Sequence, residues 1–542
     1  MSQQHPPATS GADPKWWTLT AVCLGVFMLL LDITIVNVAL PDIQDQLHAS
    51  LSDLQWVIDA YALSLAALLL TAGSLADLYG RRLVFVIGLV VFTFGSVACG
   101  SAQNITFLTI SRAFQGIGGA AMFATALALL AAAFHGKDRG TAFGVFGATT
   151  GVAVAIGPVL GGALTSGLSW RWIFFVNVPI CLVALAVTLM RLVESKDRHA
   201  GRPDWFGFVS FSIALGALVY GLIEAGEDGW GEQRVVLSFV LSGVLLVVFV
   251  VSQLLQEHPM FDLGLLRKPT FTGGLIAAFG VSASIFSLLT YLVIYVQNVL
   301  GYSAVATGVR FLFLSVASFF AAAVAGRLTE KMPVKWLIGP GFLILGVGLL
   351  LIHGIHEDSS WTHLIPGLLV SGFGVGMINP PLASTAVGVV PVSRAGMASG
   401  VNSTFRQVGI ATGIAALGSI FSQRVADAVR PQLVAGHVPA NAVHGLTAAL
   451  SGGQVVPAAT GAQQAASAQG GAAAGQQAYD LVRSVGTSGV VDSLNHITMI
   501  AAVMAFVVGA LCLVLIRQKD FVDRSATGQP TDDSGRVPET AV

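Results

Sequence analysis

Charged residues are scarce in this chain: Asp, Glu, Lys and Arg together make up 10% of its 542 residues. Soluble domains carry about 25% charged residues, so this composition cannot cover the whole molecule with a water-facing surface. The formal net charge of −1 provides no bulk attraction for nucleic acid, which we exclude as a partner. The composition therefore indicates a surface that mostly faces lipid, and the mean hydropathy of +0.78 agrees.

Cysteine is also rare, and its placement argues against two common uses. The four cysteines lie far apart inside apolar segments, and no two of them form a CxxC pair. Disulfide frameworks and structural zinc sites use paired or closely spaced cysteines. We expect Cys23, Cys99, Cys181 and Cys512 to be small apolar packing residues.

Sequence patterns of ATP-driven and catalytic proteins are missing too. No GxxxxGK[ST] sequence is present, so the chain has no phosphate-binding loop of that type for ATP. The eleven histidines lie in tails, loops or at the ends of apolar segments, which excludes a bis-histidine haem site in the membrane. We therefore expect neither an enzyme nor a protein that holds a metal or an organic cofactor.

Long apolar segments are what this sequence has in abundance. A helix needs about 20 apolar residues to cross a bilayer core, and fourteen segments meet this requirement. The first contains Asp32 and is followed by no small-residue cleavage pattern, so we interpret it as a retained helix, not a signal peptide. The predicted spans are 16–39, 54–77, 83–101, 106–134, 139–165, 170–191, 204–224, 235–255, 272–297, 304–328, 335–353, 362–388, 396–423 and 494–516.

Lysine and arginine, 27 residues in all, concentrate in alternate connections between these spans. Because basic residues favour the cytoplasmic side and the number of spans is even, we predict that both termini are cytoplasmic. The polar tails 1–15 and 519–542 are predicted to be disordered. The outer connection 425–493 is long and rich in Ala, Gly and Gln, and we expect a weakly packed external segment that is partly helical.

The connection Gly73–Arg82 (GSLADLYGRR) forms a very short, positively charged hairpin between two predicted spans. It carries one carboxylate, Asp77, together with a glycine and two arginines. A weaker copy, GRLTEKMPVK, follows at Gly326–Lys335, again between two apolar segments. Related hairpins in both halves of the chain predict two duplicated helical bundles, as in transporters.

Charges within the predicted spans are costly to insert and indicate function by default. Asp32 precedes the outer end of its span by about eight residues, or about 12 Å of helical rise, and Asn37 adds a second polar group there. Arg112 lies at a similar depth in the fourth span, with Gln115 on the same helical face. Asp32 is the obvious partner for Arg112. A pair that carries a proton and a purely structural ion pair both fit this pattern.

Other polar residues in the spans are candidates for a substrate cavity. Asp59 in the second span fits either a substrate or proton contact or a solvated helix end. Glu224 ends the seventh span, where a solvated acid is the plainer interpretation. Asn402 and Arg406 lie deeper, in the thirteenth span, and a pairing or gating role is predicted for them.

The fifth span is interrupted by four residues that alter helix geometry: Gly157, Pro158, Gly161 and Gly162. Proline removes a helical hydrogen bond, and glycines permit close approach of a neighbouring helix. A bendable helix with small faces suits a moving gate. A simple packing interface fits the same residues and does not exclude a gate.

Together these residues resemble the major facilitator superfamily, in its fourteen-helix drug–proton antiporter branch. The family hairpin pattern G-x-L-A-D-[RK]-x-G-[RK]-[RK] is matched here except at Leu78, where a base is usual. The segments LDITIVNVALP, RAFQG, GPVLGG, WRWIFFVNVPI and NSTFRQVG also resemble this branch, with Ala153 at the place of a usual glycine. The resemblance covers about residues 16–516. The gating residues it implies are Gly73, Asp77, Gly80, Arg81, Arg82, Gly157, Pro158, Gly161 and Gly162.

The resemblance implies an all-α integral membrane fold of fourteen transmembrane helices. Two six-helix bundles, 16–195 and 270–518, would be related by a pseudo-two-fold axis along the membrane normal. Two extra helices within 204–255 would link them. A central cavity would lie between the bundles.

The resemblance further implies a monomeric transporter in the cell membrane that exports amphiphilic or cationic drug-like compounds in exchange for protons by alternating access. Asp32, Arg112 and Asp59 would couple the protons. The cavity residues would be Asn37, Asp59, Gln115, Glu224, Asn402 and Arg406. Two alternatives stay open: an exporter of one endogenous metabolite, lipid or peptide, and a transport-dead sensor. The intact Asp32 and Arg112 argue against the sensor.

Overall fold

The computed structural model describes residues 14–49, 51–134, 138–196, 204–227, 229–256, 259–329 and 331–521. These residues form helices joined by short connections, and no strand occurs among them. Within the same ranges, thirteen helices are long and apolar enough to cross a membrane. The expected all-helical membrane fold is confirmed. The two predicted disordered tails lie almost entirely outside the described residues.

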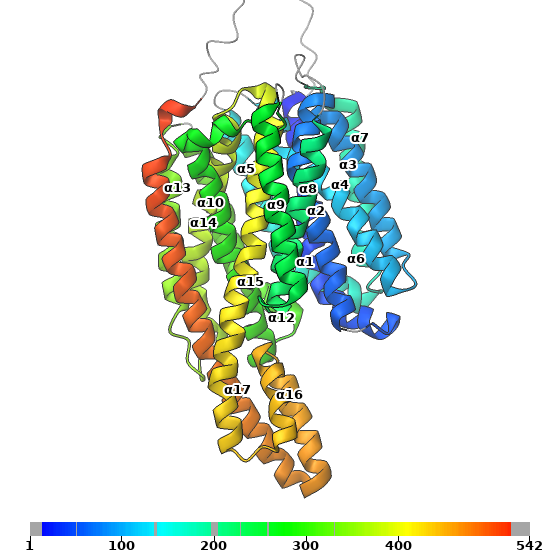
Figure 1. The fold of residues 1–542 in the computed structure, drawn as a ribbon, viewed down its shortest axis with the longest axis vertical. Helices are drawn as coiled ribbons and strands as arrows, with labels where there is room; N and C mark the ends of the chain where they lie inside the picture. The colour runs from blue at the N-terminus through cyan, green and yellow to red at the C-terminus, as the bar shows by residue number, and fades with distance from the viewer. Residues whose placement is uncertain are drawn as a thin grey trace, which may run out of the picture.

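The N-terminal bundle contains the first six spans and occupies the blue and cyan side of Figure 1. Gly80, with φ of +124°, separates the second and third helices, in a conformation that glycine adopts at low cost. The side chain of Asn104 caps the fourth helix by accepting the backbone N–H of Phe107 at 2.8 Å. The helices are α1 Pro14–Leu47, α2 Leu51–Tyr79, α3 Arg81–Gly100, α4 Ile105–Ala133, α5 Asp138–Gly167, the short α6 Trp172–Phe175 and α7 Asn177–Arg191.

The C-terminal bundle contains the remaining six spans. Pro269 begins its first helix, where the missing N–H would have no helical partner in any case, and Ser303 caps the helix at Ala304. Two π-helical segments, Ser282–Phe286 and Tyr295–Val299, interrupt the first span. The helices are α10 Pro269–Val281, α11 Ser287–Ile294, α12 Ala304–Leu328, α13 Lys335–Ile352, α14 Leu364–Gly388, α15 Ala395–Ala435, α16 Ala440–Ser451 and α17 Val455–Leu515. Short 3₁₀ turns are Leu263–Arg267, Trp361–His363, Val392–Arg394 and Gln518–Asp520.

Two linking helices, α8 Trp205–Glu227 and α9 Gln233–Leu255, connect the bundles and lie in front of their junction in Figure 1. They pack on each other, and α8 also packs on α2 and α15. Each of the fourteen predicted spans therefore coincides with helix in the structure. The sixth is divided between α6 and α7, and the ninth by its π-helical segments.

Each bundle encloses its own apolar core. The first centres on buried residues of α1 to α4, such as Met28 and Phe92. The second centres on residues of α10 to α17, such as Phe342 and Ile497. Exposed Val, Leu and Phe side chains cover α9 and the outer faces of other helices. Such surfaces match lipid, as the low charge content predicts.

The start of α1 and the end of α17 lie at the same end of the molecule, at the top of Figure 1. The hairpin between α2 and α3 lies at this end too. We call it the hairpin end below.

At the opposite end, the chain differs from expectation. Instead of a weakly packed segment over 425–493, α15 continues to Ala435, and α16 and the first part of α17 project beyond the bundles (Figure 1). Val429, Leu433 and Leu450 are fully buried in this helical extension. The prediction was based on the abundant Ala and Gly, and it did not consider the fewer Val and Leu residues that pack between these helices.

Candidate proton-coupling and substrate sites

Asp32 of α1 and Arg112 of α4 form an ion pair inside the N-terminal bundle. The guanidinium nitrogen Nη1 of Arg112 donates to Oδ2 of Asp32 at 2.5 Å. The two side chains are 0% and 1% exposed, respectively. The predicted pairing of these residues is present, and it is enclosed by the bundle instead of facing open space.

The second oxygen of Asp32 is held by two amide side chains. Nε2 of Gln115 donates to Oδ1 at 3.0 Å, and Nδ2 of Asn177 donates to the same oxygen at 2.9 Å. Both amides also donate to the hydroxyl of Ser96, at 2.7 and 3.0 Å. All of these side chains are fully buried. The carboxylate therefore has its charge balanced by Arg112 and its acceptor positions filled by neutral donors.

Arg112 has further contacts that fix its orientation. Its Nε donates to the carbonyl of Val57 at 3.2 Å, and its Nη1 also donates to Oε1 of Gln115 at 2.8 Å. The ring of Tyr61 lies against the guanidinium, with 4.1 Å from Cζ to the ring centroid. Because Val57 and Tyr61 belong to α2, a single arginine connects three helices of this bundle.

Sequence analysis found part of this network. Gln115, assigned to the substrate cavity, is instead a buried partner of Asp32 and Arg112. Asn177 and Ser96 were missed as site residues. The available signal was weak, because a single Asn or Ser in an apolar span is also a common packing residue. Only the tertiary arrangement of α3, α4 and α7 brings them to Asp32.

A second polar cluster joins the two bundles at the hairpin end. Oδ1 of Asp77, at the end of α2, accepts the backbone N–H of Gly396 at 2.9 Å, and Oδ2 accepts that of Met397 at 2.8 Å. Arg81 donates to Oδ1 through Nη2 at 2.7 Å. Asp77 thus caps the N-terminus of α15, where a negative charge is favoured. Asp77 and Arg81 are both buried.

We call the contact of Asp77 with the start of α15 the Asp77 clasp. Glycines allow α2 and α15 to approach closely there. A Cβ atom at Gly73 would lie 3.2 Å from Cα of Gly400 and would collide with the carbonyl of Gly396. Similar approaches join α5 to the other bundle: a Cβ at Gly144 would lie 3.3 Å from Cα of Gly326, and one at Gly147 would lie 3.1 Å from Pro380. The bundles are therefore in close contact at the hairpin end.

The hairpin is also tied to the end of α7, through Glu194. The carboxylate of Glu194 accepts the backbone N–H groups of Arg82 and Leu83, each at 3.0 Å. The Arg82 guanidinium donates to the carbonyl of Leu189 at 2.7 Å. A Cβ at Gly80 would be forced onto the Glu194 carboxylate. Sequence reasoning did not find Glu194, since it follows the sixth span at a distance of over 100 residues from the hairpin.

Residues of the GPVLGG segment in α5 are packed against α1. A Cβ at Gly157 would collide with the Thr34 side chain. Gly161 and Gly162 are buried. The side chains of Pro158 and of Asn37, both named as site residues from the sequence, lie outside the described part of the structure.

Asp59 and Glu224 belong to the neighbouring helices α2 and α8. These helices touch through the rings of Trp56 and Tyr220, whose centroids are 5.9 Å apart. Asp59 is half-buried one turn along α2 from Trp56, and Glu224 is 6% exposed one turn along α8 from Tyr220. The ring of Tyr61, two residues after Asp59 in the chain, packs on the Arg112 guanidinium.

Arg406 of α15 is half-buried in the C-terminal bundle and donates from Nη2 to Oδ1 of Asn379 in α14, at 2.5 Å. Asn402 lies one turn before Arg406 and is 2% exposed. Its Nδ2 atom has no hydrogen-bond partner among the described residues. Arg406 is thus paired, as predicted, but its partner is the neutral amide of Asn379.

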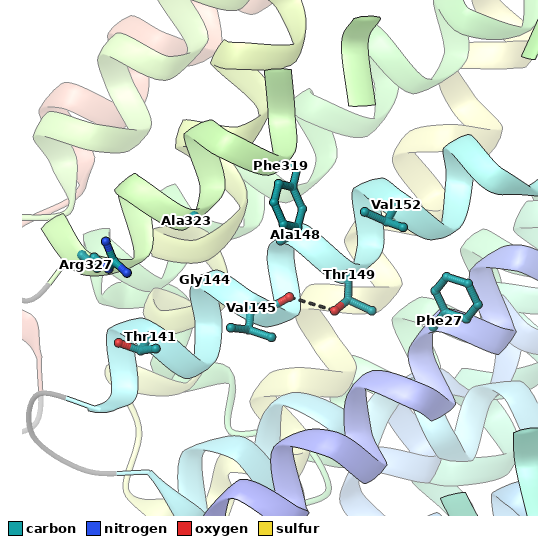
Figure 2. Close-up of a pocket in the computed structure, with 10 residues that line it drawn as sticks. All are labelled: Phe27, Thr141, Gly144, Val145, Ala148, Thr149, Val152, Phe319, Ala323 and Arg327. Atoms are coloured by element: carbon teal, nitrogen blue, oxygen red, sulfur yellow. Dashed lines mark hydrogen bonds between the residues drawn. The ribbon is translucent and has the colours of Figure 1, made fainter. Parts of the chain in front are cut away.

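A pocket of about 370 Å³ lies where α1, α5 and α12 meet, and Figure 2 shows its walls. Its side chains are mainly apolar, with Thr149 bonded to the carbonyl of Val145 at 2.9 Å. The lining residues are Phe27, Thr141, Gly144, Val145, Ala148, Thr149, Val152, Phe319, Ala323 and Arg327. Among the side chains that the structure describes, none of those assigned to the cavity from the sequence lines this pocket.

Comparison with known proteins now places this architecture in a family. The sequence model of the Major Facilitator Superfamily matches residues 22–414. The chain belongs to the major facilitator superfamily. The crystal structure of the human organic anion transporter MFSD10 shares the fold, with a TM-score of 0.56 over 77% of this chain and 94% of that chain, at 16% sequence identity. The expected family and fold are confirmed.

Bacterial members of this family are similar along most of the chain. The multidrug resistance protein Stp of Mycobacterium tuberculosis is 38% identical over 77% of this chain and 78% of that protein. The puromycin resistance protein pur8 of Streptomyces alboniger is 34% identical over 82% of this chain and 90% of that protein. The tetracenomycin C resistance and export protein of Streptomyces glaucescens is 33% identical over 78% and 79%. Among the described residues, no group of three or more His, Cys, Asp or Glu could hold a metal ion.

Proposed function

We propose that this chain exports drug-like amphiphiles across the cell membrane in exchange for protons, with Asp32 as the proton-binding group. The names of the relatives, which refer to multidrug resistance and antibiotic export, support export of such compounds. The observation that carries the proton role is the fully buried pair of Asp32 and Arg112. Charges at such positions are costly and are seldom kept without a function.

Protonation of Asp32 would change the balance of forces in this network. A neutral acid no longer attracts Arg112, whose remaining acceptors are the neutral oxygens of Val57 and Gln115. A buried cation without a counter-ion is strongly unfavourable. The loaded state would therefore favour a rearrangement of α4 relative to α1 and α2, and release of the proton would favour the arrangement described above. This makes the network a two-state element that a proton can bias.

The driving force is sufficient for uphill export. A proton that enters the cell gains about 2.3 kcal/mol per 100 mV of potential and about 1.4 kcal/mol per pH unit. A potential of 100 mV with half a pH unit supplies about 3 kcal/mol, which corresponds to roughly hundred-fold accumulation per proton.

The Asp77 clasp would serve as the gate on the cytoplasmic side. The basic residues of the hairpin, and of the other connections at that end, favour a cytoplasmic location for it and for both termini. If the hydrogen bonds from Gly396 and Met397 to Asp77 broke, α2 could separate from α15. Substrate could then enter from the cytoplasm. We propose that one chain completes this cycle as a monomer, because both bundles and their junction are supplied by a single sequence.

The range of compounds separates two versions of this function. Some relatives are named for many drugs, and others for a single compound, such as puromycin or tetracenomycin C. Export of one specific metabolite is therefore the second candidate. Both versions use the same coupling network and differ only in the cavity.

The deciding experiment uses purified protein in proteoliposomes with an imposed pH gradient. Cationic dyes and neutral amphiphiles are tested as substrates, and wild type is compared with D32N. A matched control is D262N, which removes a partly exposed acid at 2.7 Å from Arg394. We expect gradient-driven transport in wild type and D262N but none in D32N. Normal gradient-driven transport by D32N would remove Asp32 from the coupling role.

A further inference from the structure

The C-terminal bundle contains an arginine, Arg406, that forms an ion pair with none of the acids that the structure describes. Within the described residues, Arg406 has one hydrogen bond, to Oδ1 of Asn379, and no ion pair. A guanidinium has five N–H donors, so most of the donors of Arg406 are unused. Membrane interiors rarely tolerate a charged group that lacks either a partner or a functional reason.

Two neighbouring amides add further N–H donors. Asn402 lies four residues before Arg406, on the same face of α15, and its buried Nδ2 has no partner among the described residues. Oδ1 of Asn379 already accepts a hydrogen bond from Arg406, and the Nδ2 of the same amide is a donor that a further molecule can use. The three side chains thus form a cluster with a surplus of N–H groups and a positive charge.

The cluster lies near the middle of the membrane, beside the junction of the bundles. Arg406 is eleven residues from the start of α15 and Asn379 nine residues from the end of α14, which corresponds to depths of about 14 to 17 Å by helical rise. Both helices contact the N-terminal bundle, α15 through α2 and α14 through α5. Pro380, the residue after Asn379, faces Gly147 of α5 across this junction.

We propose that Arg406, with Asn379 and Asn402, binds an anionic group of the exported molecule, such as a carboxylate or an ionised phenol. The planar guanidinium matches the two oxygens of a carboxylate, and the amide nitrogens supply further donors to them. The proposal rests on the proposed export function and assigns its substrate class: amphiphiles with an acidic group, in addition to cations.

The test measures binding of three matched probes to purified protein in nanodiscs: pyrenebutyrate, its methyl ester and the analogous pyrene trimethylammonium compound. In R406Q we expect the affinity for pyrenebutyrate to fall at least tenfold, with the affinity for the ester changed less than twofold. In N379D the new carboxylate pairs with Arg406, so the same selective loss is expected although the arginine is retained. N379A removes one of the proposed amide donors but adds no carboxylate, so it should weaken pyrenebutyrate binding less than N379D does.

R310Q is the matched control for loss of one arginine in the same bundle. Arg310 donates to the carbonyl of Ala306 and lies 3.6 Å from the ring centroid of Tyr302, so its removal should leave the preference for the anion unchanged. Equal loss of all three probes in R406Q, or an unchanged affinity of N379D for pyrenebutyrate, would overturn the proposal. No measurable binding of pyrenebutyrate to wild type would overturn it as well.

A separate measurement distinguishes this result from failure of the proposed function. Transport of the three probes is followed in proteoliposomes with and without a pH gradient. If no probe is moved by the gradient while R406Q still loses anion binding selectively, proton-driven export fails and the anion site stands. If the gradient drives transport of the ester and R406Q does not discriminate among the probes, the anion site fails alone.

Discussion

Replacing Asp77 by Asn should open the junction of the two bundles at the hairpin end. Asp77 accepts two backbone N–H groups of α15 and the Arg81 guanidinium. An amide keeps one acceptor oxygen but presents an NH₂ group at the other position, so at least one of the two bonds to Gly396 and Met397 is lost. The negative charge at the start of α15 is lost as well.

These losses set the size of the effect. A hydrogen bond to a charged group contributes about 1.5–3 kcal/mol, and a charge at a helix terminus about 0.3–1 kcal/mol. Together they amount to about 2–4 kcal/mol, which is a shift of roughly 30- to 700-fold in the ratio of open to closed molecules. Such a shift makes a rarely populated open state readily detectable.

The assay is a distance measurement between spin labels on T141C and R327C, at the ends of α5 and α12 that meet in Figure 2. We expect D77N to raise the ratio of long-distance to short-distance molecules by roughly 30- to 700-fold. D262N removes an acid at the same end whose exposed ion pair with Arg394 contributes about 0–1 kcal/mol, and it should change the populations little. A change below threefold in D77N, or an equal change in D262N, would refute the assignment of Asp77 as the clasp.

The remaining predictions concern transport by purified protein. D32N should abolish uphill transport but allow some downhill exchange, and persistence of uphill transport would contradict the role of Asp32. R112A should abolish transport and R112K should restore little of it, because one ammonium cannot reproduce contacts with Asp32, Gln115 and Val57; full activity of R112K would show that a point charge is enough. D59N should weaken transport of cationic amphiphiles about tenfold more than that of neutral ones, a difference of roughly 1.4 kcal/mol, and equal losses would assign Asp59 to packing or proton handling. Replacing the mostly exposed tip of the extension, Gly461–Gln477, by a short Gly/Ser linker should preserve transport within about threefold, or roughly 0.6 kcal/mol in the rate-limiting barrier; loss of transport in a correctly inserted variant would show that the tip gates the cavity or recruits a partner.

Much of the fold could be predicted from the sequence because the membrane restricts the possible structures. Backbone groups in lipid must be hydrogen-bonded within the segment, so each apolar run of sufficient length had to be a helix. The helix from Asp138 to Gly167 was found in this way despite its many glycines. The helical extension over 425–493 was not predicted as a packed structure. Outside the membrane, helix ends are determined by contacts between α15, α16 and α17 and no longer by the thickness of a bilayer.

The candidate site, too, was predictable from the sequence only in part. Asp32 and Arg112 stand out in sequence because ionised residues are rare in apolar spans, and their similar depth predicts that they meet. The role of Gln115 and the participation of Asn177 were not predictable in this way. A neutral amide costs less to bury than a charge, so its presence in a span carries less information.

The sequence by itself therefore determined where the membrane-spanning helices lie, the family and the charged residues of the buried pair. These properties follow from hydrophobic length and from the cost of burying charge, both of which are local. The tertiary structure alone decided which polar groups surround Asp32, that Asp77 caps the first turn of α15, and that Arg406 has a neutral partner. Those contacts join residues from 27 to 320 positions apart, and no local pattern specifies which of several possible partners the packed helices will bring together.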